Sequence, residues 1–577
     1  MAAIKFRSAL GVERMYEEGF GGIDLTASKG SCHLAENLDK CADGSMKARA
    51  GYSAAIEHEG ILRASFNHAG RLYTIAGDTF AVTSIDSGEK EAEAQLDNGD
   101  GSADIFCFGG DIYIHDGCKF YLWKNGELDP VEGYAPLYGK DWDALKCGVI
   151  NEDINILSDR IRISYLLSET TSVFYLGIKA ASIDRVERNG EWLHQESLNI
   201  HLDGSNPAIV QSDGISGVCT VTFWLTLSPE ESQKHRIQQT TKAFVFGNNG
   251  GERLCLYNPG ISCNLYSSIP VSRSEQVLSA LTASDALPLY VPASSALCVG
   301  SGASPVTGLA QHYGRGILFT ESDAWFIDWN DKEDDPSVKK PQCFLLNSAI
   351  GADHIQSSAY FDNDPITYFC GRLWRWHSGS NVRDECSASM ISDEVAELIP
   401  KDSEQISMLS LPQMQKVFIS DAEDDMGRLL VYDLARRAWT LYSGIFAESL
   451  LRYGNLPAFS RGGCIYVFKP ELDEDEEPDE VFPIRSKLVT HFLDFGCPEK
   501  VKRSATVLVE YDLFGGAATL TLENEKGEKT VSILRGKTDG GREQFSEHIR
   551  LPRFKKLRLT LEAGSPAVIY NAIISVK

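Results

Sequence analysis

The stretches Gly70-Arg71-Leu72-Tyr73-Thr74-Ile75 and Gly110-Asp111-Ile112-Tyr113-Ile114-His115 are short apolar runs, and each begins after a glycine. Each is followed by a turn and a second aromatic run, such as Lys119-Phe120-Tyr121-Leu122-Trp123. Runs of this kind, bounded by Gly, Asp or Asn, predict antiparallel β-strands. Tyr73 and Tyr113 lie 40 residues apart, which is the length of one four-stranded propeller blade.

The same pattern returns in the second half of the chain. From Ile317 it recurs at steps of 49, 51 and 48 residues, at Ile366, Val417 and Ile465. These steps are again the length of a blade. The sequence therefore predicts an all-β chain whose main body is a β-propeller of about six or seven blades.

Three stretches interrupt or end this repeat. Residues 148–240 contain longer alternating runs and the hairpin signal Asn189-Gly190, which predict an inserted β-sandwich. Residues 471–480 are acidic and contain a proline, so we expect a solvated linker, too charged to bury, that ends the propeller. Alternating runs between Gly-rich turns then predict a C-terminal β-sandwich.

The expected domains are therefore four. They are an N-terminal arm with the first blades (1–147), the inserted β-sandwich (148–240), the remaining blades (241–483) and the C-terminal β-sandwich (484–577).

The composition predicts a soluble protein without a membrane span. The 577 residues contain no apolar run of about eighteen residues, and the first residues resemble no secretory signal, so we expect synthesis and folding in the cytoplasm. Fourteen cysteines occur without zinc-ligand spacing. They are interpreted as reduced core thiols, which predicts no disulfide and no metal role.

The formal net charge of −26 excludes a surface that clamps nucleic acid through phosphate neutralisation. The charge is uneven, because residues 484–577 hold 16 Lys and Arg against 11 Asp and Glu, a net +5, and the rest carries −31. An acidic wall past which DNA moves remains compatible with these values.

No catalytic frame is present. The twelve histidines form no Gly-x-Ser-x-Gly elbow and no His-Glu-x-x-His pattern, and the repeated box of sialidase propellers is missing. Carboxylate pairs carry little information in so acidic a chain. The sequence predicts no enzyme, with no catalytic, cofactor-binding or metal-binding residues and no cofactor.

Three local motifs have a functional and a structural interpretation. Residues 97–104, Asp97-Asn98-Gly99-Asp100-Gly101-Ser102-Ala103-Asp104, resemble an acidic calcium loop, but without EF-hand spacing a solvated turn is favoured and calcium binding is left open. Gly247-Asn248-Asn249-Gly250-Gly251 lies between two predicted strands, so a hairpin is favoured over a phosphate loop. Trp374-Arg375-Trp376-His377 could stack on a sugar or base, although core packing is favoured.

Longer segments resemble virion proteins of tailed bacteriophages. The residues that carry the resemblance are Gly21-Gly22-Ile23-Asp24-Leu25, Leu34-Ala35-Glu36-Asn37, the run 44–52 (Gly44-Ser45-Met46-Lys47-Ala48-Arg49-Ala50-Gly51-Tyr52), the run 306–327 (from Val306-Thr307-Gly308-Leu309 through Gln311-His312-Tyr313-Gly314 to Trp325-Phe326-Ile327) and Ile350-Gly351-Ala352. In layout the resemblance covers roughly residues 20–480. The group comprises tail nozzle or tail-tubular B-type proteins of short-tailed phages and packaged-DNA stabilisation (head-completion) proteins.

This resemblance implies a structural protein of the virion tail, made in the cytoplasm of the host bacterium. It implies a homo-oligomeric ring, expected to be sixfold, below the portal and adaptor, where it contacts other tail proteins. Genomic DNA would be retained and then ejected through the lumen without specific binding. The basic C-terminal segment has no counterpart in the resemblance.

Two alternatives remain open. A baseplate or host-surface module that binds glycans is motivated by the aromatic strands and by the predicted propeller itself. A glycan-cleaving enzyme is disfavoured by the missing catalytic frame.

Overall fold

The computed structural model of the chain describes residues 12–14, 22–26 and 31–576, apart from 147, 194–197, 200–208, 216, 248–251, 271–288, 301, 303, 329–340, 354–357, 362, 379–385, 402–404, 479, 497 and 565. These residues form strands and three short 3-10 helices, η2 (Lys234–Gln239), η3 (Ala293–Ser295) and η5 (Asp393–Val395). The predicted all-β class is confirmed. Among the described residues, no helix has the length and apolar character needed to cross a membrane.

Five antiparallel sheets of four strands make up much of the middle of the chain. The first contains β6 (Leu62–His68), β7 (Arg71–Ala76), β8 (Thr79–Ser84) and β9 (Lys90–Gln95), and the second β10 (Asp104–Phe108), β11 (Asp111–His115), β12 (Phe120–Lys124) and β13 (Glu127–Pro130). The third contains β22 (Lys242–Phe246), β23 (Arg253–Tyr257), β24 (Asn264–Ser267) and β25 (Leu297–Cys298). The fourth contains β26 (Val306–His312), β27 (Arg315–Thr320), β28 (Ala324–Asp328) and β29 (Gln342–Asn347), and the fifth β30 (Ser358–Phe361), β31 (Asp364–Phe369), β32 (Arg372–Ser378) and β33 (Cys386–Met390).

Two further four-stranded groups belong to larger sheets. The sixth group is β34 (Ile406–Leu411), β35 (Lys416–Asp421), β36 (Leu429–Asp433) and β37 (Ala438–Tyr442). The seventh is β38 (Ser449–Tyr453), β39 (Leu456–Arg461), β40 (Cys464–Lys469) and, from the N-terminal part of the chain, β5 (Gly51–Glu57). The seventh group therefore joins residues separated by most of the chain.

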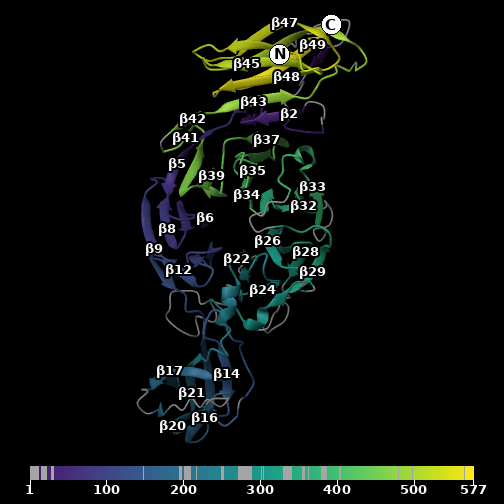
Figure 1. Ribbon diagram of the computed structural model, residues 1–577. Helices are drawn as coiled ribbons and strands as arrows, with labels where there is room; N and C mark the ends of the chain where they lie inside the picture. The colour runs from purple at the N-terminus through teal and green to yellow at the C-terminus, as the bar shows by residue number, and fades with distance from the viewer. Residues whose placement is uncertain are drawn as a thin grey trace.

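The first strands contact one another at most of the junctions between neighbouring groups. β6 contacts both β10 and β38, β10 contacts β22, and β34 contacts both β30 and β38, while β26 contacts β31 of the fifth sheet. Apolar clusters fill the space between groups, as where Ile75 and Phe80 meet Ile105 and Ile112. Figure 1 shows the seven groups following one another around a common centre.

The predicted repeat has one shift in register. Ile317, Ile366 and Val417 lie in the second strands of their groups, but Ile465 lies in β40, the third strand of the seventh. The equivalent second strand is β39, which contains Pro457 and has fewer aromatic residues than β40. Because β5 supplies the last strand from elsewhere in the chain, the seventh group fits three strands into residues 449–469.

The part of the chain between the second and third sheets forms a separate pair of sheets. One contains β14 (Leu137–Trp142), β15 (Arg160–Leu167), β21 (Cys219–Leu227), β17 (Ala180–Arg188) and β18 (Glu191–Leu193), and the other β16 (Thr171–Tyr175), β20 (Ile209–Ile215) and β19 (Leu198–Asn199). Buried side chains of both sheets share one apolar cluster. We call these strands the inserted unit; its first strand, β14, precedes residue 148.

The C-terminal strands pair with strands near the N-terminus. They are β43 (Arg485–Thr490), β44 (Lys502–Asp512), β45 (Ala517–Asn524), β46 (Lys529–Arg535), β47 (Glu543–Phe554), β48 (Leu557–Gly564) and β49 (Val568–Val576), and their partners are β1 (Val12–Arg14), β2 (Cys32–Glu36) and β4 (Met46–Ala48). β3 (Leu38–Lys40) extends the same sheet by pairing with β4. We call β43–β49 the C-terminal unit. β2 pairs with both β37 and β43, so the sixth group and part of this unit form one nine-stranded sheet.

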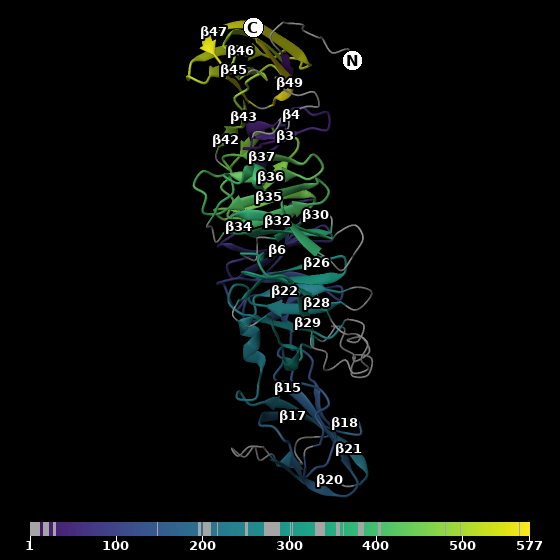
Figure 2. The ribbon, with the colours of Figure 1, turned by 90° about the vertical axis from the view of Figure 1, so that its right-hand side faces the viewer.

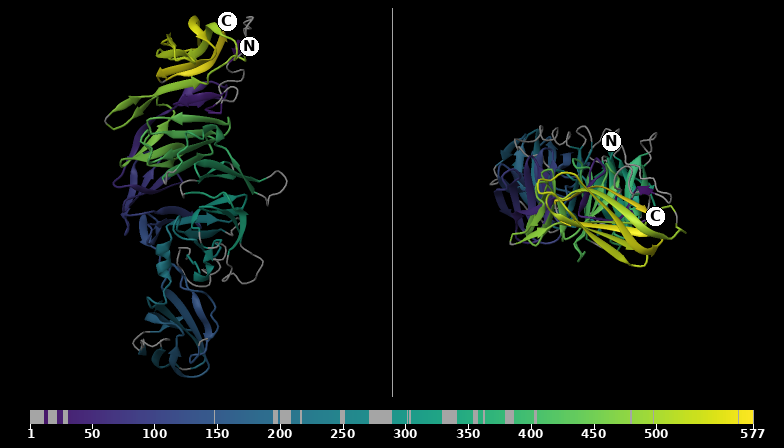
Figure 3. Two further views of the ribbon diagram at one scale, coloured as in Figure 1. Left: turned by 45° about the vertical axis from the view of Figure 1, so that its right-hand side comes forward. Right: turned by 90° about the horizontal axis from the view of Figure 1, so that it is seen from above.

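The molecule is elongated. Figures 1 and 2 place the C-terminal unit at one end and the inserted unit at the other, with the seven groups between them. Figure 3 shows the same order in a third orientation.

The acidic run at residues 471–480 is not the fully solvated linker that its charge predicts. It contains β41 (Glu474–Glu476), which pairs with β5 and with β42 (Val481–Pro483). Asp475 is buried. The expectation that the run is too charged to bury is wrong at this residue, because the side chain of Arg49 pairs with it.

Candidate functional site

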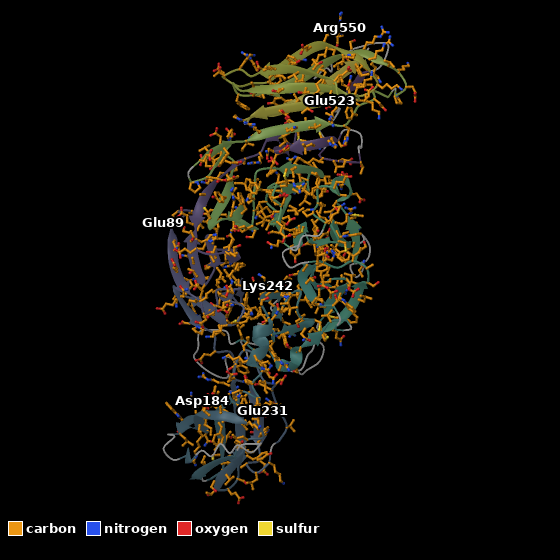
Figure 4. All side chains as sticks on the ribbon, in the orientation of Figure 1. Glu89, Asp184, Glu231, Lys242, Glu523 and Arg550 are labelled. Atoms are coloured by element: carbon orange, nitrogen blue, oxygen red, sulfur yellow. The ribbon has the colours of Figure 1, made fainter. Side chains whose placement is uncertain are left out.

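A small cavity lies where the first strands of five groups begin. Its volume is about 180 Å³, and β6, β10, β22, β34 and β38 all contribute to its lining. The polar lining residues include Asp104, Lys242, Ser407 and Ser449. Figure 4 shows Lys242 near the middle of the molecule. We call this the inner cavity.

Two charged residues of the inner cavity are held by backbone groups. The Lys242 Nζ donates to the carbonyl oxygen of Ala103 at 2.6 Å, and the Asp104 carboxylate accepts the N–H of Ala243 at 2.8 Å. Burial raises the pKa of Asp104, and the charge of Lys242 opposes that shift. The two residues therefore join the second sheet to the third and place a carboxyl group and an amine beside the cavity.

A second cavity of about 380 Å³ lies at the far ends of first strands in the third, fourth and fifth sheets. Phe244, Tyr313 and Tyr360 supply aromatic rings, and Gln311 and Asn363 supply amides. We call this the aromatic cavity. Tyr360 Oη accepts the backbone N–H of Gln311 at 2.8 Å, and burial raises the pKa of Tyr360 to about 12. Flat apolar rings beside amide groups are suited to neutral polar ligands such as sugars.

The loop at residues 97–104 accepts hydrogen bonds from the side chain of Arg63, a residue of β6. Arg63 donates to the carbonyl oxygens of Asn98, Asp100 and Gly101 at 2.6–2.8 Å, and also to those of Gly77 and Asp116. The carboxylate of Asp97 pairs with Lys119. In the described part of the chain, no group of three or more His, Cys, Asp or Glu side chains is suitably placed to hold a metal ion. The contacts with Arg63 fit the turn interpretation of this loop.

His115 is a buried histidine next to this loop. Its Nδ1 accepts the N–H of Gly117, its Nε2 is 3.1 Å from Thr240 Oγ1, and its ring lies 4.3 Å from that of Phe120. Burial lowers the pKa of His115 to about 4. The imidazole is therefore neutral at pH 7. Its contact with Thr240 joins the second sheet to the residues just before β22.

The tryptophan motif at 374–377 lies in β32. Trp376 is fully buried, and its Nε1 donates to Thr367 Oγ1 at 2.9 Å. Its ring packs against Phe319. The prediction of core packing is confirmed for Trp376, whereas Trp374 is only partly buried. The guanidinium of Arg375 makes an ion pair with the carboxylate of Asp364, the first residue of β31.

The segments that carry the phage resemblance occupy tightly packed places. Residues 306–327 form β26, β27 and most of β28. A Cβ added at Gly351 would lie 2.1 Å from the carbonyl oxygen of Thr320, and one at Gly51 would lie 1.9 Å from that of Glu474. These two positions therefore exclude side chains. Gly21 and residues 248–251 of the Gly-rich hairpin lie outside the described residues.

A buried polar cluster joins the N-terminal strands to the rest of the molecule. The Arg49 guanidinium makes a bidentate pair with Asp475 at 2.8 and 2.6 Å, and its Nε donates to Asn37 Oδ1 at 2.9 Å. Asn37 Nδ2 donates to Ser443 Oγ and to the carbonyl oxygen of Arg485. Sequence reasoning missed this cluster, because its members are far apart in the chain and Arg49 lies among residues noted only for their resemblance.

The expectation that all cysteines are core thiols is wrong in part. Cys298 and Cys370 are exposed, and Cys263 is partly exposed. Cys255 and Cys464 are buried as expected.

No family model and no curated protein matches the chain. Among solved structures, the computationally designed protein Ika8 is similar over 73% of this chain and 99% of its own, with 10% identity and a TM-score of 0.34. The extracellular domain of a hybrid two-component system from B. thetaiotaomicron is similar over 90% of this chain, with 9% identity and a TM-score of 0.38, and this chain spans 60% of it. Sqt1 of Saccharomyces cerevisiae has 8% identity and a TM-score of 0.34 over 74% of this chain and all of its own. TM-scores this low carry no inference about function.

Proposed function

We propose that the chain is a structural subunit of a phage tail, a nozzle or hub protein that assembles into a ring around DNA below the portal and adaptor. The observation that carries this proposal is the elongated arrangement of the β units: a central body with an inserted unit at one end and a C-terminal unit at the other. A subunit with a β unit at each end has two separate surfaces with which neighbouring rings can make contact.

The proposed architecture is a seven-bladed β-propeller with two appended β-sandwiches. The contacts between first strands of neighbouring groups support the propeller, and so does the seventh group, in which β5 pairs with β40. Closing the last blade with a strand from the other end of the chain removes a free sheet edge. The shared apolar clusters of paired sheets support the two sandwiches.

The charge distribution supports passage of DNA without binding. The chain carries −26 in total, and the residues before 484 carry −31. A wall of this sign repels phosphates, whereas a basic wall would hold the duplex through counterion release. The C-terminal unit is net positive, so we propose that it contacts an acidic surface of a neighbouring tail protein rather than the lumen.

Electron microscopy of purified virions and of the concentrated full chain tests this proposal. We expect closed rings of one subunit type, with the seven groups around the lumen or within its wall. A chain that stays monomeric at all concentrations and is missing from virions would overturn it.

Recognition of host-surface glycans is the second candidate function, and the aromatic cavity favours it. Tyr313 is exposed there, beside Phe244 and the amides of Gln311 and Asn363. A glycan array with the full chain and with Tyr313→Ala tests this candidate. Hits that Tyr313→Ala weakens at least tenfold support glycan recognition, and an array without hits removes it.

A further inference from the structure

Two cysteine side chains meet at the outer edge of the third sheet. Cys263 directly precedes β24, and Cys298 is the last residue of β25, whose pairing partner is Asn264. The two Sγ atoms are 3.2 Å apart. Two thiols this close need only a small rotation of each side chain to reach bonding distance.

The sulfur pair is open to reagents. Cys298 is exposed and Cys263 is partly exposed. Gly302 lies over both: a Cβ added there would be 3.0 Å from Cys298 Sγ and 3.8 Å from Cys263 Sγ. Because residue 302 is a glycine, no Cβ atom occupies this position beside the two sulfur atoms.

We propose that Cys263 and Cys298 form a reversible disulfide bond by exchange with a small disulfide such as oxidised glutathione. The thiolate of one cysteine attacks a sulfur atom of glutathione disulfide, and one glutathione leaves as its thiol. The second cysteine then loses its proton, attacks the mixed disulfide at the first cysteine, and releases the second glutathione. The two cysteines are oxidised, and one glutathione disulfide is reduced to two thiols that take up both protons.

A metal site is the competing use of two adjacent thiols. Structural zinc takes four ligands from Cys, His or carboxylate side chains. Within the described residues, no third His, Cys, Asp or Glu gathers with this pair. The pair therefore fits a disulfide better than a metal.

Exposure separates Cys298 from three other cysteines, of which Cys255 is buried and Cys343 and Cys386 are partly buried. Burial raises the pKa of Cys255, Cys343 and Cys386 to about 12, so their thiolates are scarce at neutral pH. The pKa of Cys298 is also raised, chiefly by its hydrogen bond with Cys263. We therefore expect exchange to be slow at neutral pH and faster in mild alkali, because the thiolate is the attacking species.

The bond would close the chain between residues 263 and 298. β25 is two residues long and pairs with β24 through two residue pairs. A covalent link there would hold the outermost strand of the third sheet in place and reduce the freedom of the intervening segment in the unfolded state.

The test uses the full chain, incubated with oxidised glutathione at about pH 8.5, near the ordinary thiol pKa. Free thiols are then alkylated, and the chain is digested for peptide mapping without reductant. We expect one cross-linked peptide joining Cys263 to Cys298, with a loss of two hydrogen atoms and no glutathione on either residue. Reduction should restore two free thiols.

Two controls make the result decisive. In Cys298→Ser, Cys263 should carry one glutathione, because no second thiol releases it. In the unaltered chain, the exposed Cys370 should also carry glutathione rather than a cross-link. Alkylation of both Cys263 and Cys298, or a separate glutathione on each, under conditions that modify Cys370 would overturn the proposal.

Discussion

Arg49 is a charged side chain from which solvent is almost fully excluded, and its partners come from distant parts of the chain. It pairs with Asp475 of β41 and with Asn37, which itself contacts residues 443 and 485. A buried charge that loses its partner remains desolvated, and such losses are typically worth about 3–5 kcal/mol.

We therefore expect Asp475→Ala to destabilise the chain by about 3–5 kcal/mol. Arg49→Met combined with Asp475→Leu should lose less, because it leaves no buried charge unpaired. Denaturant unfolding measures the stability of Asp475→Ala, of the double variant, and of Arg49→Met and Asp475→Leu alone. The double variant and its two single variants give the coupling energy between residues 49 and 475. Glu91→Gln, which breaks the exposed pair with Arg71, is the control and should leave the unfolding midpoint unchanged. Equal losses in the Asp475 and Glu91 variants would contradict this account.

His115 links stability to pH. Its folded-state pKa of about 4 lies below the unfolded value of about 6.5, so the unfolded chain binds the proton more readily. The stability it contributes is complete above pH 6.5 and is lost as the pH falls toward 4. The full loss is about 3 kcal/mol for a shift of this size.

His115→Gln should remove this part of the acid sensitivity while lowering stability at pH 7. The measurement is the denaturant midpoint at pH 7 and at about pH 4.5 for both chains. His33 and His58 also have lowered pKa values, caused mainly by burial, so some acid sensitivity should persist in the variant. An unchanged pH dependence in His115→Gln would show that this residue is not the source.

At the scale of elements, the strand β5 is held on both sides. It pairs with β40 on one side and with β41 on the other. The backbone at Gly51 leaves no room for a Cβ, which would lie 1.9 Å from the carbonyl oxygen of Glu474.

Gly51→Ala should therefore push β41 away from β5 and strain the buried Arg49–Asp475 pair. We expect a loss of stability of about 1–3 kcal/mol, as for other overpacked positions, and faster proteolysis near residues 471–483. Gly564→Ala is the matched control, because a Cβ at that strand residue meets no atom within 4 Å. Equal protease rates in the two variants would count against the close approach at Gly51.

Strand positions were the part of the fold that local pattern could predict. Period-2 alternation is a local signal, and β21 and β45 follow it residue by residue. The partners of strands were not predictable in the same way. The pairing of β5 with β40, the burial of Asp475 and the approach of Cys263 to Cys298 all depend on residues far away in the chain. Neither cavity was predicted, because each is assembled from several first strands that share no motif.

At the scale of the whole molecule, the net charge of −26 predicts how the chain behaves toward DNA. We expect no retardation of double-stranded DNA in gel electrophoresis with the full chain, even at low salt, where phosphate attraction would be strongest. A basic DNA-binding protein at the same concentration provides the positive control. Retardation that weakens with added salt would show that a basic surface dominates, and would argue against a repelling channel wall.

The distance along the chain between β5 and β40 has a consequence for biosynthesis. β5 leaves the ribosome early, yet β40 follows about 400 residues later, as their register shows. At ordinary translation rates of about 5–20 residues per second, this interval is roughly 20–80 seconds. During that time the edge of β5 has no partner, and unpaired edges invite association between nascent chains. We therefore expect the yield of native protein to depend on chaperones that shield the N-terminal strands until synthesis reaches the end of the seventh group.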